Sequence, residues 1–132
     1  MSLAAERPTP TPYELAGGEA GLRRIVDAFY DIMESDPDVA EIRNMHASDL
    51  GPMREKLFDW LSGWMGGPDR YSKRPDAGCV VSAHRDFAIG EVEHDQWMSC
   101  MRRAFTEAGL ADDILPVFDA AFSRVAEGLR NR

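Results

Sequence analysis

The chain has 132 residues, with 15 lysines and arginines against 23 aspartates and glutamates, and a formal net charge of −8 at pH 7. This length fits one domain rather than two sizeable cores. Hydrophobic residues make up 44% of the chain and charged residues 29%, which is a globular composition and not a disordered one. The acidic balance argues against nucleic acid or an anionic membrane as a partner, because both repel a negatively charged surface.

The N-terminal segment and the two cysteines indicate the cellular compartment and exclude some kinds of metal and haem site. Residues 1–12 are polar, rich in proline and threonine, and lack the apolar core of a signal peptide. We therefore expect a flexible tail over 1–12, a single domain over 13–132, and a cytoplasmic protein without a membrane span. Cys79 and Cys100 form no C-x-x-C pair, so neither a zinc knuckle nor a covalently attached c-type haem is expected.

Four segments carry apolar residues three and four positions apart, the spacing of an amphipathic helix. The spacing predicts helices over 18–34, 52–65, 91–108 and 112–129, with one further turn over 38–43. Asp49 or Ser48 could cap the second helix, and Asp112 or Asp113 the fourth. Residues 69–80 show little periodicity, and so long a connection is typical of a functional or ligand-supported segment.

Few side chains in this all-α domain suggest chemistry. His84 follows the long connection and precedes the third helix. A histidine on such a turn can ligate haem iron through one imidazole, although a surface or capping histidine is the commoner case. Tyr30 and Trp97 lie on apolar helix stripes and, taken alone, predict core residues. His46 alone predicts a solvated turn histidine, and His94, in a charged stretch, is expected to be exposed and without a role.

Several motifs occur in a fixed order: V-D-A-F-Y at 26–30, D-L at 49–50, K-L-F at 56–58, L-S-G-W-M-G-G-P at 61–68, Tyr71, H-R-D-F-A-I at 84–89, and D-Q-W-M-S-C-M at 95–101. His84 lies sixteen residues after Pro68. In order and spacing, these motifs resemble the group II truncated haemoglobins over about residues 13–129. The resemblance implies a truncated two-over-two globin fold, with four main helices around a non-covalently held haem b and a largely irregular F region.

The resemblance also implies residue roles. His84 matches the proximal ligand that binds iron through its ε nitrogen, and Tyr30, His46 and Trp97 match distal residues that stabilise the bound ligand. Further cofactor contacts are implied at Met53, Lys56, Leu57, Trp60, Leu61, Tyr71 and Phe87, with Lys56 and Tyr71 near the propionates. One departure is Ala83, where the family usually has a propionate-binding arginine. Arg85 and Lys73 are the candidates to replace it.

Three functions follow as hypotheses. The first is a binder of dioxygen and other diatomic ligands that releases oxygen slowly, because donors aimed at the ligand hold it, with ligand kinetics that depend on pH through His46. The second is a haem redox enzyme, acting on nitric oxide or peroxide, reduced by a separate reductase partner. The third is a haem-free helical interaction module. The sequence leaves monomer and homodimer open.

Overall fold

The structure, a computed structural model, describes residues 9–132, and every regular element within that range is helical. The elements are α1 (Pro12–Leu15), α2 (Gly18–Ser35), the 3-10 helix η2 (Pro37–Val39), α3 (Ala40–Asn44), α4 (Gly51–Trp64), α5 (Val80–Ala83), α6 (Glu91–Glu107) and α7 (Leu115–Leu129). The four predicted long helices are α2, α4, α6 and α7. The short helices α1 and α5 were not predicted, because a single turn carries no measurable period.

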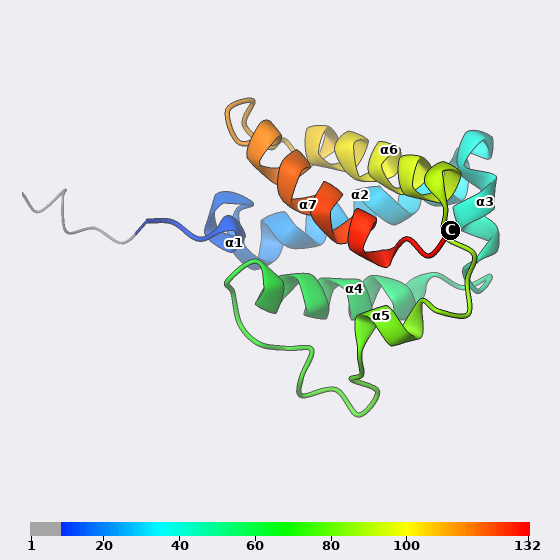
Figure 1. The fold of residues 1–132 in the computed structure, drawn as a ribbon. Helices are drawn as coiled ribbons and strands as arrows, with labels where there is room; N and C mark the ends of the chain where they lie inside the picture. The colour runs from blue at the N-terminus through cyan, green and yellow to red at the C-terminus, as the bar shows by residue number, and fades with distance from the viewer. Residues whose placement is uncertain (1–8) are drawn as a thin grey trace, which may run out of the picture.

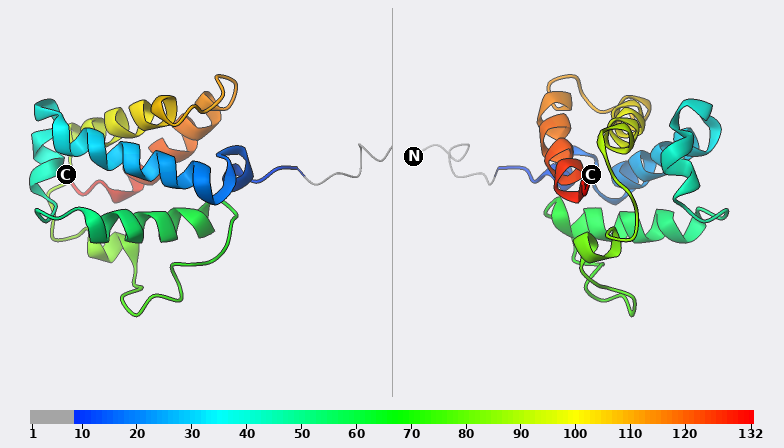
Figure 2. Two further views of the ribbon diagram at one scale, coloured as in Figure 1. Left: turned by 180° about the vertical axis from the view of Figure 1, so that it is seen from behind. Right: turned by 45° about the vertical axis from the view of Figure 1, so that its right-hand side comes forward.

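The helices form a two-over-two sandwich. Helix α2 packs against both α4 and α6, and α6 packs against α7. Figure 1 shows α4 and α5 on one side and α2, α6 and α7 on the other, and the views in Figure 2 agree with this division. The fold class expected from the sequence is confirmed. No helix within residues 9–132 is long and apolar enough to cross a lipid bilayer.

Helix α2 supplies the centre of the core. Its residues at three- and four-residue spacing, among them Leu22, Ile25, Val26, Phe29 and Met33, are at most 1% exposed. Apolar burial of this kind is worth about 1.5–3 kcal/mol for each large side chain. The helix is therefore fixed by its packing against α4 and α6 more than by intrinsic helix propensity.

The start of the domain differs from the expected tail. Residues 1–8 of that tail lie outside the described part of the chain. Thr11 and Pro12 belong to the fold, since the Thr11 hydroxyl accepts from the Glu14 amide at 3.2 Å and caps α1. The Tyr13 amide also donates to the Met65 carbonyl at 2.9 Å, which ties α1 to the end of α4.

Two details of the helices correct the sequence prediction. Helix α7 begins at Leu115 and not at 112, with Pro116 in its first turn and no side-chain cap from Asp112 or Asp113. In α4, apolar spacing predicts one inner face of Met53, Leu57, Trp60, Leu61 and Trp64. Of these only Leu61 is deeply buried, together with Phe58 and Ser62, whereas Met53, Leu57 and Trp60 are half-buried and Trp64 is exposed. Apolar periodicity shows a helix and a face, but it cannot tell a packed face from one that borders a cavity.

The connection between α4 and α5 is irregular, as expected, and is held by polar contacts. The Ser62 hydroxyl donates to the Pro68 carbonyl at 2.7 Å. Arg74 donates to the carboxylates of Asp59 at 2.7 Å and Asp76 at 2.8 Å, which fastens the connection to α4. The connection thus follows a defined path along one side of the cavity described next.

Candidate functional site

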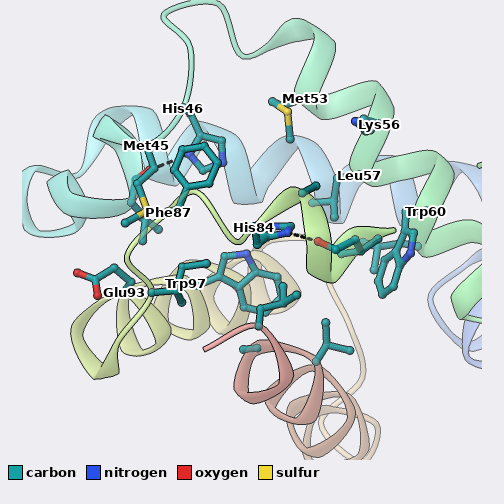
Figure 3. A pocket seen from close by; sticks show the side chains of 18 of the residues that line it. Met45, His46, Met53, Lys56, Leu57, Trp60, His84, Phe87, Glu93 and Trp97 are labelled. Atoms are coloured by element: carbon teal, nitrogen blue, oxygen red, sulfur yellow. Dashed lines mark hydrogen bonds between the residues drawn. The ribbon is translucent and has the colours of Figure 1, made fainter. Parts of the chain in front are cut away.

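One cavity of about 390 Å³ lies among α4, α5, α6 and α7. Figure 3 shows side chains from these helices converging on it. Every residue that the sequence predicted for the site lines this cavity: Tyr30, His46, Met53, Lys56, Leu57, Trp60, Leu61, Tyr71, His84, Phe87 and Trp97. The lining also includes Phe122, Val125 and Leu129 of α7, which the sequence analysis did not assign to the site.

His84 is presented by the short helix α5. Its Nδ1 atom lies 2.6 Å from the carbonyl oxygen of Val80, one turn earlier. Because a carbonyl only accepts, Nδ1 carries the hydrogen in the neutral ring, and Nε2 keeps a free lone pair. A backbone carbonyl on Nδ1 is the usual way in which a protein sets the tautomer of a metal-binding histidine. The arrangement leaves Nε2 available as a ligand atom (Figure 3).

Two donors from different helices border the same cavity. Tyr30 on α2 is 2% exposed, and Trp97 lies on α6. Both rings pack edge-on against Phe29, with centroid distances of 4.9 Å for Tyr30 and 5.5 Å for Trp97. Neither the phenol O–H nor the indole N–H donates to another residue within 9–132. Burial raises the pKa of the Tyr30 phenol far above its ordinary value, against a smaller lowering by Arg54, so the group stays a donor.

His46 faces the cavity from the turn after α3, and unlike Tyr30 and Trp97 it offers an acceptor. Its Nδ1 atom lies 2.7 Å from the Ile42 carbonyl, so the neutral ring points an unprotonated Nε2 away from that bond. Burial lowers the pKa of His46 below its ordinary value of 6.5, with the Arg43 charge adding to this, while the bond to Ile42 opposes it. At neutral pH the side chain is therefore an acceptor, and two of the three predicted distal groups remain as donors.

Few lysine or arginine side chains lie around the cavity. Of the lysines and arginines in residues 9–132, Lys56 alone lines the cavity, and its Nζ lies 3.8 Å from an Asp76 carboxylate oxygen. The Tyr71 hydroxyl donates to the Gly78 carbonyl at 3.1 Å and accepts from the Gly78 amide at 3.2 Å. Arg85 and Lys73, the two candidates to replace the missing arginine at Ala83, do not line the cavity.

His94 corrects the sequence prediction. It was expected to be exposed, but its side chain is 15% exposed and it lines the cavity. Nδ1 pairs with Asp95 at 3.0 Å, and Nε2 is buried with no hydrogen-bond partner among residues 9–132, 3.7 Å from a Glu127 oxygen. Its position one turn before Trp97 on α6 was the available signal, because residues three apart share a helix face.

Comparison with known proteins shows which family the chain belongs to. Residues 11–126 match the family described as bacterial-like globin. The group 2 truncated haemoglobin YjbI of Bacillus subtilis is 32% identical over 103 residues, which are 78% of this chain and 75% of that protein. The group II 2-on-2 haemoglobin of Agrobacterium tumefaciens has a TM-score of 0.87 at 32% identity, covering 95% of this chain and 97% of its own.

A third structure, described as a truncated oxygen-avid haemoglobin from Bacillus subtilis, has a TM-score of 0.82 at 30% identity, covering 92% of this chain and 100% of its own. The chain therefore belongs to the bacterial-like globin family, and within it to the group II truncated haemoglobins with the two-on-two fold.

The cavity fits the haem that this family implies. Its volume of about 390 Å³ lies within the ~300–1,000 Å³ of small-molecule and cofactor sites. Its walls are mainly apolar, and one imidazole nitrogen with a free lone pair lies among them. Membership of the globins makes the chain a haem-dependent binder of diatomic ligands such as oxygen.

Proposed function

We propose that this chain holds haem b through the Nε2 atom of His84 and retains dioxygen through donors from Tyr30 and Trp97, so that oxygen leaves slowly. When bound, haem supplies the iron centre to which a diatomic ligand attaches. The observation that carries the proposal is the Nδ1 bond of His84 to the Val80 carbonyl, because it leaves the opposite nitrogen with a lone pair that can bind iron.

The slow release rests on the two unengaged donors. Tyr30 and Trp97 reach the cavity from α2 and α6 with an O–H and an N–H group. A hydrogen bond to a ligand that carries partial negative charge is worth about 1.5–3 kcal/mol. Each donor that meets the ligand would thus slow its departure by about ten- to a hundredfold. The Bacillus subtilis protein described as oxygen-avid supports the same direction.

His46 adds a dependence on pH. Its neutral ring offers an acceptor to the cavity, and it becomes a donor only when protonated. Because burial lowers its pKa below 6.5, protonation occurs on the acid side of neutrality. Oxygen release should therefore slow further as the pH falls through that range, and His46→Phe should remove this part of the profile.

Ligation is tested by substitution and chemical rescue. His84→Gly should abolish the ordinary five-coordinate spectrum after haem reconstitution, and added imidazole should restore it. His94→Gly removes another imidazole from the same cavity and should keep the spectrum of the unchanged protein. An ordinary iron–histidine spectrum in His84→Gly without imidazole would refute the assignment, and no Soret band in any form would refute haem binding.

A haem-dependent oxidoreductase fed by a separate reductase is a second candidate. The unprotonated Nε2 of His46 favours it, because a positioned imidazole acceptor can take the proton that peroxide chemistry must move. Steady-state turnover with peroxide, and of nitric oxide with a reductant, separates the two functions. Turnover no faster than that of free haem, and unaffected by His46→Phe, would leave ligand binding as the function.

A further inference from the structure

The segment after α7 folds back onto the turn that follows His84. Figure 1 shows the chain after α7 ending, at the C mark, beside the link between α5 and α6. The Asn131 side chain donates from Nδ2 to the Phe87 carbonyl at 2.8 Å and to the His84 carbonyl at 3.4 Å. Its Oδ1 atom accepts from the Ile89 amide at 2.9 Å. One amide group thus contacts three backbone groups of the link.

The main chain strengthens the same contact. The amides of Asn131 and Arg132 both donate to the Ile89 carbonyl, at 2.9 Å and 3.1 Å. We call residues 131–132 with the backbone of 84–89 the clasp. It joins two segments more than forty positions apart, and it does so next to the residue proposed to ligate iron.

The His84 segment has little other support. Helix α5 is four residues long and contains no buried residue. In the link, Arg85, Asp86, Phe87 and Ala88 are exposed. A segment with few buried apolar contacts and exposed hydrogen bonds opens easily unless something holds it. In the described chain, the clasp supplies that hold through hydrogen bonds rather than apolar packing.

We infer that Asn131 is a positioning residue for His84: through the clasp it fixes the orientation of α5 and thereby the direction in which the imidazole meets haem. The inference rests on the proposed ligation by His84. An asparagine amide suits the place because it gives hydrogens to two carbonyls and takes one from an amide. Aspartate would lose both donated bonds and set a carboxylate against two carbonyl oxygens.

The test uses the full chain with haem and compares Asn131→Asp, Asn131→Leu and Asn131→Gln. Asn44→Asp is the matched control, because Asn44 is exposed on α3 and lies outside the clasp and the cavity lining. Resonance Raman of the ferrous form reports the iron–histidine stretching band, and transfer to an excess of an apoglobin acceptor reports haem loss.

We expect Asn131→Asp and Asn131→Leu to shift or broaden the stretching band and to speed haem loss by about tenfold, the scale of one or two lost hydrogen bonds. Asn131→Gln keeps the amide and should recover part of both effects. Asn44→Asp should match the unchanged protein. A merely stabilising role would lower the melting temperature and leave the band unchanged.

Amide hydrogen exchange at Ile89 in the haem-free chain tests the clasp without the cofactor. Asn131→Leu removes the oxygen that accepts from the Ile89 amide. Faster exchange in Asn131→Leu, with an unchanged band and unchanged haem loss, would mean that the clasp exists but does not position His84, and would overturn the inference while leaving ligation intact. An iron–histidine band that persists in His84→Gly would instead overturn the proposed function, and the inference with it. Unchanged exchange would overturn the clasp itself.

Discussion

Tyr30 and Trp97 reach the cavity with O–H and N–H groups that donate to no other residue within 9–132. Both groups are therefore free to donate to a ligand that occupies the cavity. His84 and His46 each have Nδ1 bonded to a backbone carbonyl, which leaves Nε2 of each ring as an acceptor and not a donor.

The phenol of Tyr30 gives the first prediction at the residue scale. Tyr30→Phe keeps the ring and removes only the hydroxyl, so it should speed oxygen dissociation by about ten- to a hundredfold, as the loss of one strong hydrogen bond implies. Stopped-flow measurement of the off-rate checks this. Tyr13→Phe, which alters a tyrosine outside the cavity lining, is the control. Equal off-rates in Tyr30→Phe and the unchanged protein would remove Tyr30 from the proposed role.

His46 gives the second prediction at the residue scale. Burial lowers its pKa in the fold below the unfolded value of about 6.5, so the fold favours the neutral ring. The resulting stability is fully present above pH 6.5 and is lost as the pH falls toward the folded pKa. Urea unfolding of the haem-free chain between pH 5 and 8 should therefore show a smaller acid loss in His46→Phe than in the unchanged protein. Parallel curves would contradict this.

At the scale of the elements, close contacts between helices depend on glycines. Gly21 lies on α2 against the end of α1, and a Cβ built there would lie 1.8 Å from the Ala16 carbonyl oxygen. Gly67, after α4, is similar, since its Cβ would lie 2.5 Å from the Tyr13 ring. Both contacts let α1 pack closely against the rest of the domain, and the contact at Gly67 explains one glycine of the Gly-Gly-Pro motif.

We expect Gly21→Ala to lower the free energy of unfolding by at least about 1–3 kcal/mol, because the backbone must shift to admit the methyl group. Gly128→Ala is the matched control, since no atom lies within 4 Å of the Cβ position there. That change should raise stability by about 0.5–1 kcal/mol, the difference in helix propensity. Urea denaturation measures both. Equal effects of the two substitutions would contradict the close contact at Gly21.

At the scale of the whole molecule, the cavity borders a single buried core to which α2, α4, α6 and α7 all contribute. The α2 side is closed by Phe29, Met33 and Met101, whereas α4 faces the cavity with half-buried Met53, Leu57 and Trp60. A cofactor that fills this space binds the folded chain only, so its binding free energy adds to stability.

Haem should therefore raise the melting temperature of the chain, with about 2.7 kcal/mol gained at a free concentration a hundredfold above the dissociation constant. Calorimetry of the haem-free and reconstituted chain measures the rise. In His84→Gly the rise should be smaller, because apolar contacts remain and the axial bond is lost. A rise of the same size in His84→Gly would show that ligation contributes nothing to the coupling.

The sequence by itself determined the four long helices and their order, and its motifs pointed to many of the residues that line the cavity. Those features depend on apolar spacing and on motifs that are local in the chain. The Lys56 and Tyr71 positions were predicted in the same way, and their proposed roles toward propionates stay predictions.

The tertiary structure decided the features that depend on contacts between distant or irregular segments. The burial of His94 beside Glu127 and the contact of Asn131 with residues 84–89 both arise where separate elements meet. The free nitrogens of His84 and His46 were decided by which carbonyl each ring lies against. Periodicity reports how one helix divides into faces; only packing determines what each face meets.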